Sequence, residues 1–323
     1  MKKIAIIGAG WVGCHLAKNL KDNHNVKLID KSGIFAETSF RNQNRLHMGF
    51  HYPRNFNTRK LCYDTFDKFS DEYSNIISKV ENNIYAIPKD KSVIDFQTYK
   101  NILTYEKLNF RNFDLNALKN IEGCIACDEK HINHKIAKKY FDQQLNDVFE
   151  KVEIQSNDLL KISKEFDLII NCTNNSIKDV TEKTYYELCI VLLYRKKRQT
   201  DFDALTLMDG QFFSIYPYQN DIYTVTDVQH TPVYKSENID LNYDIDLIQR
   251  IKKIEDKINY YYPDFNMDFE YVDYFLSLKV KKHNESADRY PVINKKNNII
   301  NCYTGKIQGI YLIEEFVNES INR

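Results

Sequence analysis

The stretch of the chain richest in side chains that can do chemistry is residues 41–55, "RNQNRLHMGFHYPRN". It holds two histidines, three arginines and two large aromatic residues, yet it shows neither the 3.6-residue apolar period of a helix nor the alternation of a half-buried strand. An imidazole exchanges protons near neutral pH, so His47 is the first candidate for an acid–base residue and His51 the second. The plain structural alternative is that both histidines only hydrogen-bond the loop backbone.

A second set of residues predicts a dinucleotide site. Gly8, Gly10 and Gly13 fit G-x-G-x-x-G between an apolar run at residues 3–7, expected as a strand, and a helical pattern that includes Val12. In such a turn the first glycine permits the tight bend, the second lets the backbone approach a pyrophosphate, and the third allows close packing of strand and helix. The helix N-terminus then offers unpaired N–H groups to the phosphates.

A carboxylate follows at the expected distance. Asp30 ends the next predicted strand, residues 26–30, and Lys31 comes directly after it. A carboxylate at this spacing accepts hydrogen bonds from ribose hydroxyls, and its charge would repel a 2′-phosphate, which disfavours NADP. The motif therefore predicts dinucleotide binding with Asp30 and Lys31 on the ribose side, and it leaves NAD and FAD open.

The remaining patterns predict the elements that hold these residues. A helix is expected over residues 58–79, strand-like runs with polar turns over 84–123, a helix over 134–149, and an apolar strand with a polar turn over 166–175. Alternating β-branched and aromatic runs over 185–230 predict an antiparallel sheet. A helix then stops at Pro263, and the chain ends as it begins, with strand, glycine turn and helix.

This organisation predicts an α/β fold. Because a nicotinamide dehydrogenase usually has a contiguous Rossmann unit, a unit built from both chain ends favours the longer FAD molecule. We expect a Rossmann-like FAD-binding domain with an inserted antiparallel β-sheet substrate domain. The FAD-binding domain should comprise residues 1–82, 124–180 and 285–323, and the substrate domain residues 83–123 and 181–284.

Composition limits the partners. Lys plus Arg and Asp plus Glu number 45 each, so no net charge attracts nucleic acid. No run approaches the roughly 20 apolar residues of a membrane span, and the N-terminal apolar run leads into a glycine turn instead of a cleavage site. The seven cysteines are odd in number and lie mostly in apolar segments, as reduced thiols do. We expect a cytoplasmic protein that acts on a small molecule, with no nucleic-acid partner and no integral membrane segment; its oligomeric state stays open.

The motifs resemble those of the D-amino acid oxidase superfamily of FAD-dependent oxidoreductases over most of the chain. "SFRNQNRLHMGFHYPRNFNTRKLC" resembles the loop and helix start of L-2-hydroxyglutarate oxidases, and "FDLIINCTNN" and "DRYPVIN…NCYTGKI" resemble the segments that return to the cofactor. A narrower resemblance, in "RLHMGFHYPR", "MDGQFFSIYPY" and "TGKI", is to flavoproteins associated with surface-polysaccharide biosynthesis. That resemblance implies a sugar-linked substrate, with a nucleotide sugar as one candidate.

The resemblance also implies which residues lie along FAD. These are Ser39, Arg41 and Asn42 near the phosphates, Arg45, Leu46 and His47 near the isoalloxazine, Val152 at the adenine, Thr173 at the phosphate-side turn, and Gly305, Lys306 and Ile307 at the flavin pyrimidine. A lysine or a helix N-terminus at that last position can stabilise negative charge on the reduced ring. His47 is also a candidate for covalent attachment of the flavin. One departure is Asn174, which stands where the superfamily often has glycine.

Three residues are hypothesised to act on the substrate: His47, Arg289 and Tyr216. The resemblance implies that Arg289 clamps a carboxylate or phosphate, for which a guanidinium is suited, whereas an ion pair with Asp288 is the alternative. Tyr216 and Tyr218 could hydrogen-bond and stack on a polar substrate, or be ordinary sheet aromatics.

A metal centre is not predicted, although four residues have metal-ligand types. Cys124, Cys127, His131 and His134 form C-x2-C-x3-H-x2-H, but zinc sites generally draw their two ligand pairs from separated turns. The hypothesis that remains is an FAD-dependent oxidoreductase moving a hydride from a C–H bond next to a hydroxyl or amine to flavin N5. The alternatives are an NAD-linked sugar dehydrogenase or epimerase, and a catalytically silent FAD-binding protein.

Overall fold

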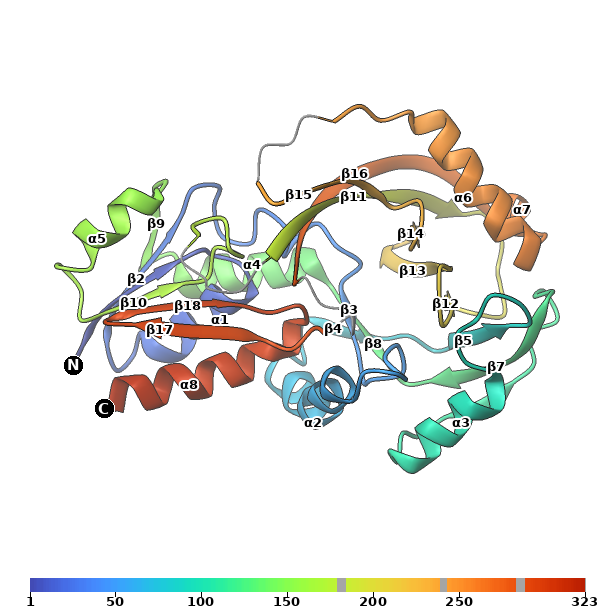
Figure 1. The fold of residues 1–323 in the computed structure, drawn as a ribbon, viewed down its shortest axis with the longest axis horizontal. Coiled ribbons are helices and arrows are strands. Elements are labelled where there is room, and N and C mark those ends of the chain that lie inside the picture. The colour runs from blue at the N-terminus through green and yellow to red at the C-terminus, as the bar shows by residue number, and fades with distance from the viewer. Residues whose placement is uncertain (179–183, 239–242, 283–287, 323) are drawn as a thin grey trace.

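The computed structural model describes residues 1–178, 184–238, 243–282 and 288–322. A mainly parallel sheet lies at one end of the molecule together with both chain termini, and a larger, mainly antiparallel sheet lies at the other end (Figure 1). The predicted domain borders at 180/181 and 284/285 fall outside the described residues. The predicted fold class, with parallel and antiparallel sheets in one α/β chain, is confirmed.

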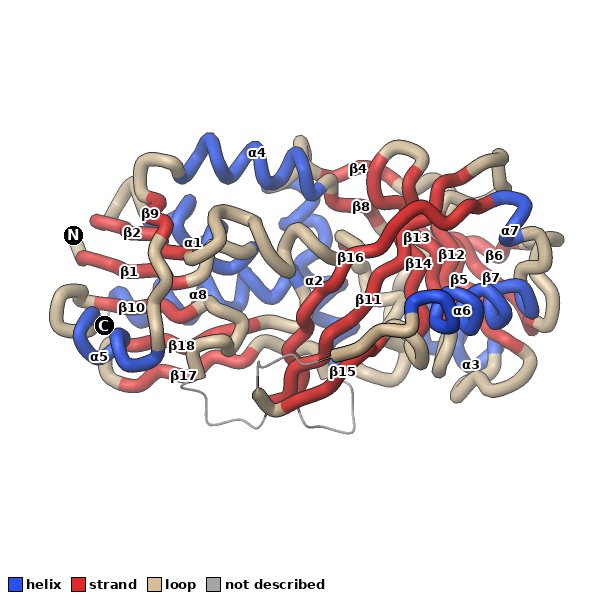
Figure 2. Tube along the Cα trace, turned by 90° about the horizontal axis from the view of Figure 1, so that it is seen from above, coloured by secondary structure: helices blue, strands red, loops and turns tan. Residues whose placement is uncertain are grey.

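The six-stranded sheet joins the two ends of the chain. Its order is β17 (Val292–Lys296), β18 (Ile299–Tyr303), β10 (Leu168–Asn171), β1 (Lys3–Ile7), β2 (Asn25–Asp30) and β9 (Phe149–Lys151). All neighbours pair in parallel except β17 and β18. Figure 2 shows β2, β1 and β10 side by side at the N-terminal end. Strand β18, near the C-terminus, is thus separated from β1, the first strand of the chain, by β10 alone.

Both faces of this sheet are buried, as the continuous apolar run of β1 predicts. Ile4 and Ile6 pack in the core beneath the helices α1 (Trp11–Leu20), α4 (His134–Leu145) and α8 (Ile310–Asn322), whereas Ala5 and Ile7 pack on the other face toward α5 (Leu159–Ile162). The short 3₁₀ turns η1 (Ser156–Asp158) and η2 (Ile307–Gly309) precede α5 and α8.

The nine-stranded sheet is the second layer. Its main path runs β15 (Pro232–Ser236), β11 (Thr184–Lys196), β14 (Ile222–Asp227), β13 (Phe213–Gln219), β12 (Ala204–Leu207), β5 (Asn83–Pro88), β7 (Ile121–Cys127) and β6 (Arg111–Phe113), and β16 (Phe269–Lys282) pairs with β11. Only β5 and β12 pair in parallel. The helices α6 (Leu247–Tyr261), α7 (Phe265–Asp268) and α3 (Phe96–Tyr105) pack against this layer.

A small sheet connects the two layers. It consists of β3 (Arg45–Leu46), β8 (Lys130–Ile132) and β4 (Ile77–Lys79), with Arg45 paired to His131. The predicted border at 123/124 runs through β7, whose last residues belong to the nine-stranded sheet. The division into two domains therefore stays a prediction, whereas the two sheets themselves are observed.

Two predicted elements differ from the structure. The helix expected over 58–79 is α2 (Phe56–Glu72): Asn55 caps its start by accepting from the Thr58 N–H at 2.8 Å, and residues 77–79 leave the helical pattern to pair with β8 as strand β4. The strand-like region 84–123 contains helix α3, whose start is capped by Asp95. Only Tyr99 and Leu103 of α3 are buried, so its apolar period is too short to be distinguished in the sequence.

Candidate functional site

The glycine turn has the close packing that a dinucleotide site requires. Gly8 has φ +104°, and a Cβ there would lie 2.6 Å from the Cys172 carbonyl oxygen. A Cβ on Gly13 would lie 1.8 Å from the Gly8 carbonyl oxygen, so any larger residue would push α1 away from β1. These contacts give the first and third glycines the roles expected of them.

The N-terminus of α1 faces the loop that carries Ser39. The Trp11 N–H donates to Ser39 Oγ at 3.0 Å, and a Cβ on Gly10 would lie 2.8 Å from that oxygen. The next N–H groups, of Val12 and Gly13, lie in the first turn of the helix, where no intrahelical acceptor exists. This arrangement fits a phosphate, which would accept from these donors.

The rest of this loop is ordered by its own side chains. Asn42 Nδ2 donates to the Thr38 carbonyl at 2.7 Å, while the Arg41 side chain is exposed. On the far side of the turn, the Thr173 N–H and hydroxyl both donate to Asn171 Oδ1, at 3.2 and 2.7 Å. Asn174, which replaces an expected glycine, has φ +54°, a conformation that asparagine adopts more readily than most residues.

The Asp30 carboxylate accepts main-chain hydrogen bonds from the glycine turn and from the residues that follow Asp30. Its Oδ1 accepts from the N–H groups of Ser32 and Gly33 at 2.7 and 3.1 Å, whereas its Oδ2 accepts from the Ala9 N–H at 2.8 Å and has a second lone pair for a further donor. The Val152 main-chain N–H donates to the Asp30 carbonyl at 3.1 Å. Lys31 forms an exposed ion pair with Glu153 at 3.6 Å.

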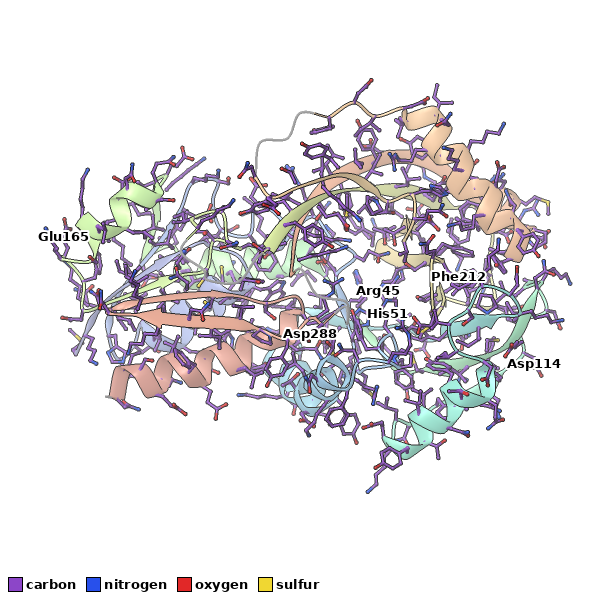
Figure 3. All side chains as sticks on the ribbon, viewed as in Figure 1. Arg45, His51, Asp114, Glu165, Phe212 and Asp288 are labelled. Atoms are coloured by element: carbon purple, nitrogen blue, oxygen red, sulfur yellow. The ribbon has the colours of Figure 1, made fainter. Side chains whose placement is uncertain are left out.

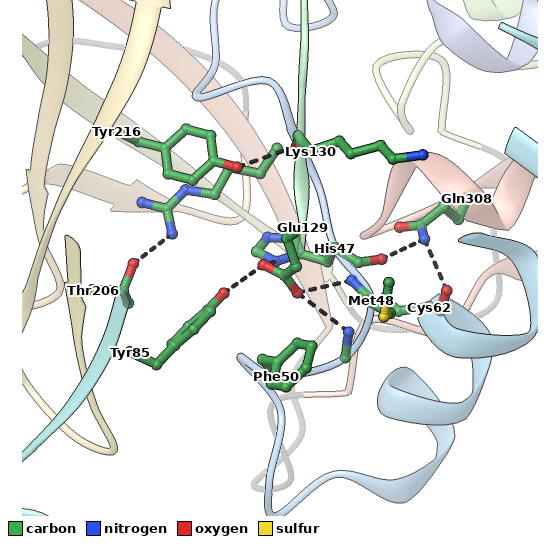
Figure 4. Close-up of polar contacts among 12 residues, drawn as sticks. His47, Met48, Phe50, Cys62, Tyr85, Glu129, Lys130, Thr206, Tyr216 and Gln308 are labelled. Atoms are coloured by element: carbon green, nitrogen blue, oxygen red, sulfur yellow. Dashed lines mark hydrogen bonds and ion pairs between the residues drawn. The ribbon is translucent and has the colours of Figure 1, made fainter. Parts of the chain in front are cut away.

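The most elaborate polar contact joins His47 to Glu129, a residue that the sequence did not single out (Figure 4). Glu129 is fully buried, and its Oε2 lies 3.2 Å from His47 Nδ1 and 2.6 Å from the Tyr85 hydroxyl. Its Oε1 accepts from the N–H groups of Met48 and Gly49 at 2.8 and 3.3 Å. Because an ionised carboxylate only accepts, His47 must carry its proton on Nδ1, which leaves Nε2 as the basic nitrogen.

The C-terminal turn is tied directly to this histidine. Gln308 is fully buried, and its Nε2 donates to the carbonyls of His47 at 2.6 Å and Cys62 at 3.0 Å. The loop at 41–55 and the turn at 303–307 are therefore neighbours, as the sequence predicted. Leu46 is buried in the core beneath the helices, and Ile307 begins η2 and packs against the same core.

Positive charge gathers around this junction. Lys306 Nζ lies 4.7 Å from the centre of the Tyr52 ring, and Arg289 packs so closely on Gly305 that a Cβ there would lie 2.9 Å from the Arg289 Cδ. Burial, and then the charges of Arg289 and Arg45, lower the pKa of Lys306 to about 7, although Cys62 and Glu129 act in the opposite direction.

The two histidines of the loop are held neutral. Burial and the nearby Lys306 charge lower the pKa of His47 to about 4, against the opposing influence of Glu129. Burial also lowers the pKa of His51, whose ring lies 5.5 Å from that of His47. Burial alone would raise the pKa of Glu129, but the contact with His47 and the hydrogen bonds from His47, Tyr85 and the Met48 N–H keep it below its usual value. At neutral pH the pair is therefore a carboxylate and an uncharged imidazole.

The other two residues expected to act on substrate occupy different positions. The Tyr216 side chain is fully buried, and its hydroxyl donates to the Lys130 carbonyl at 3.1 Å, so its ring supports Arg45 instead of offering a free hydroxyl. Arg289 is half-buried, and its main-chain N–H donates to Thr58 Oγ1 at 3.0 Å. The Tyr218 ring stacks on the His134 ring, with 4.3 Å between their centres.

The cysteine–histidine motif forms no metal centre among the residues that the structure describes. Cys124 and Cys127 lie in β7, His131 in β8 and His134 at the start of α4, and the described residues hold no group of three or more suitable ligands.

Among the described residues, no helix has the length and apolarity that a bilayer crossing needs.

Sequence comparisons find FAD-dependent proteins similar to this chain. Residues 3–84 match the DAO family model, described as FAD dependent oxidoreductase. The chain is 29% identical over 330 residues to the FAD-dependent monooxygenase FPY4 of Fusarium mangiferae, covering 97% of this chain and 89% of that protein. It is 25% identical over 368 residues to the FAD-dependent monooxygenase kojA of Aspergillus flavus, covering 99% and 86%.

The fold is shared with solved amino acid oxidases. The chain is similar to glycine oxidase from Geobacillus kaustophilus, with a TM-score of 0.74, 11% identity and coverage of 98% of this chain and 94% of that one. It is also similar to NikD, an unusual amino acid oxidase essential for nikkomycin biosynthesis, with a TM-score of 0.75, 8% identity and coverage of 97% and 92%. The class defined by fold and sequence is an FAD-dependent oxidoreductase. More narrowly, residues 3–84 are similar to the DAO family model, and FAD is the cofactor, as the sequence predicted.

Proposed function

We propose that this enzyme oxidises a small polar substrate at a C–H bond next to a hydroxyl or an amine, with His47 accepting the proton. When bound, FAD supplies the hydride acceptor, flavin N5. The observation that carries the proposal is the buried His47–Glu129 pair, which Gln308 ties to the C-terminal turn. A histidine that only packed the loop would need no fully buried carboxylate with four donors.

The chain's residues supply the proton acceptor. Glu129 fixes the proton of His47 on Nδ1, so that Nε2 is unprotonated at neutral pH and can accept a proton from a substrate hydroxyl or ammonium group. Bonds from Tyr85 and from two main-chain N–H groups hold Glu129 in turn. This support limits the movement of the imidazole, which is the requirement for efficient proton transfer.

The cofactor-binding residues remain as the sequence proposed them. The α1 N-terminus with Ser39, Arg41 and Asn42 would hold the phosphates, Asp30 with Lys31 the ribose, and Val152 the adenine. Thr173 would line the phosphate-side turn, and Gly305, Lys306 and Ile307 would meet the flavin pyrimidine. Lys306, whose pKa is lowered to about 7, would take up a proton as the ring is reduced and so stabilise the negative charge on it.

The substrate is proposed by class. The solved structures that share the fold include glycine oxidase and an amino acid oxidase, which supports an amino or hydroxy acid. A sugar-linked substrate, including a nucleotide sugar, is proposed on the sequence resemblance to flavoproteins associated with surface-polysaccharide biosynthesis, whereas the resemblance to L-2-hydroxyglutarate oxidases supports a hydroxy acid. A cytoplasmic location likewise stays a prediction.

Anaerobic mixing with candidate substrates tests the proposal. The FAD-loaded protein is mixed with amino acids, 2-hydroxy acids, free sugars and nucleotide sugars, and the flavin absorbance is followed. One class is expected to bleach the yellow colour, and a folded, FAD-loaded His47→Gln variant should bleach at least roughly 100-fold more slowly. If no class bleaches the wild-type flavin, the protein is better described as an FAD-binding protein without this chemistry.

Oxygen insertion is a second candidate function, because curated relatives covering nearly the whole chain carry the name FAD-dependent monooxygenase. In that reaction one atom of O₂ enters the product and the other leaves as water, with two electrons and two protons supplied by a reductant. Turnover under ¹⁸O₂ separates the two: product mass raised by one ¹⁸O atom supports insertion, whereas unlabelled product with hydrogen peroxide supports simple oxidation.

A further inference from the structure

Arg45 is a buried cation whose hydrogen bonds are incomplete. It lies on β3 and only 9% of the residue is exposed, and Figure 3 shows it in the middle of the molecule near His51. Its Nη1 donates to Thr206 Oγ1 on β12 at 2.9 Å. Within the described part of the chain, its Nε and Nη2 are buried and have no hydrogen-bond partner.

The guanidinium is nevertheless held in one place. Its central carbon lies 4.2 Å from the centre of the Tyr216 ring on β13, and the Tyr216 hydroxyl is itself fixed by the Lys130 carbonyl. The Tyr216 ring lies against one face of the guanidinium, and Thr206 Oγ1 binds its Nη1. The edge that carries Nε and Nη2 is therefore in contact with neither residue's polar atoms. Those two donors are adjacent and coplanar, the arrangement that pairs with two oxygens of one anion.

Among the residues that the structure describes, no carboxylate accepts a hydrogen bond from the Arg45 guanidinium. Glu129, the buried carboxylate of the site, is already bound by His47, Tyr85 and two main-chain N–H groups. Lys306 and Arg289 add further positive charge around the same junction. A buried guanidinium with unpartnered donors is costly, so its retention points to a ligand that completes it.

We propose that Arg45 binds an anionic group of the substrate, a carboxylate or a phosphate, through Nε and Nη2, with Thr206 and Tyr216 as positioning residues. The inference rests on the proposed function and deepens it, because it makes the substrate an acid. It also places the anion site two residues before His47, so strand β3 and the residue that follows it would present both the anion-binding arginine and the proton acceptor. The same oxyanion chemistry could come from the FAD phosphates, and the test distinguishes the two sources.

Anion binding to the FAD-loaded protein is measured without turnover. Acetate and inorganic phosphate, which have no C–H bond next to a hydroxyl or an amine, are titrated against the flavin absorbance spectrum and the melting temperature, and neutral acetamide is the control ligand. The variants are Arg45→Met and Arg45→Lys, and the matched control is Arg195→Met, an exposed arginine on strand β11 of the nine-stranded sheet. At least one anion is expected to bind saturably, at least 10-fold more weakly in Arg45→Met, weakened to a smaller degree in Arg45→Lys, and unchanged in Arg195→Met.

Each other outcome overturns the inference. No saturable anion binding by the wild type, or equal anion affinity in Arg45→Met, removes Arg45 from any substrate site. Loss of FAD uptake by Arg45→Met, with anion binding to the FAD-free protein unaffected, assigns the residue to the cofactor. Because these measurements need no reaction, a failure to bleach the flavin would count against the proposed function and leave this result intact. A methionine replaces an unpaired buried charge, so Arg45→Met is expected to melt no lower than the wild type.

Discussion

Replacement of Glu129 by glutamine is expected to cost little stability and most of the activity. The carboxylate accepts from Met48 and Gly49 on one oxygen and from His47 and Tyr85 on the other. A glutamine amide has the same shape but only one acceptor oxygen, and this must face the two main-chain N–H groups, which cannot accept. Its NH₂ group then faces the histidine and the tyrosine, whose hydroxyl can turn to accept.

The histidine can accept from that NH₂ group only if its proton moves from Nδ1 to Nε2. Four charge-assisted hydrogen bonds become neutral ones, each weaker by about 1 kcal/mol, while the desolvation cost of the buried charge is relieved, so the free energy of unfolding should fall by about 2 kcal/mol. With Nε2 protonated, His47 no longer accepts the substrate proton, and kcat should fall by roughly 10²- to 10⁴-fold, the size of a general-base contribution.

Three measurements check this expectation. Urea unfolding gives the change in stability, anaerobic flavin bleaching gives the rate, and NMR of ¹⁵N-histidine-labelled protein shows which ring nitrogen carries the proton. The matched control is Glu122→Gln, an exposed side chain that accepts from the Phe96 N–H at 2.7 Å and whose replacement should change stability by less than about 0.5 kcal/mol. A Glu129→Gln protein that bleaches at the wild-type rate with its proton still on Nδ1 of His47 would refute the reasoning.

Three further outcomes follow from packing and burial. Gly13→Ala places a Cβ 1.8 Å from the Gly8 carbonyl oxygen, so purified protein should retain little FAD, measured as the ratio of flavin to protein absorbance. Gln308→Leu removes two buried bonds, one to the His47 carbonyl, and should lower the unfolding free energy by about 2 kcal/mol in urea, with an unchanged value counting against the link. Burial lowers the pKa of His131 to about 4, below its unfolded value of about 6.5, so its contribution to stability is full above pH 6.5 and is lost as the pH falls toward 4. His131→Asn should therefore reduce the difference in unfolding free energy between pH 7 and pH 4.5, measured by urea titration, by about 2 kcal/mol.

The parts of the fold that were predictable are those whose signals are local. The glycine spacing and Asp30 identify the dinucleotide turn because each residue meets a requirement of the same short strand–turn–helix unit. Helix α3 is not predicted because only two of its residues are buried. The predicted helix over 58–79 is too long because Ile77 continues the apolar pattern, although residues 77–79 pair with strand β8. Pairing across the chain overrides such local patterns.

The supporting residues of the site were not predictable for a related reason. Glu129 contacts a histidine 82 positions away, and Gln308 contacts the same residue from 261 positions away, so neither leaves a mark in its own neighbourhood. Glu129 could have been found only through its place in "ACDEKHINH", an acidic turn before a helical pattern. Tyr216 was expected at the substrate because tyrosines can bind polar groups, and only the three-dimensional contacts show that its hydroxyl is already used.

A crystal structure of the protein with FAD bound tests the central claim most directly, since it shows whether the two chain ends form one cofactor site. We expect the pyrophosphate to lie at Gly10 and the N-terminus of α1, and the isoalloxazine ring to lie beside both His47 and Lys306. An ordered ring that contacts neither of these two side chains would contradict this expectation.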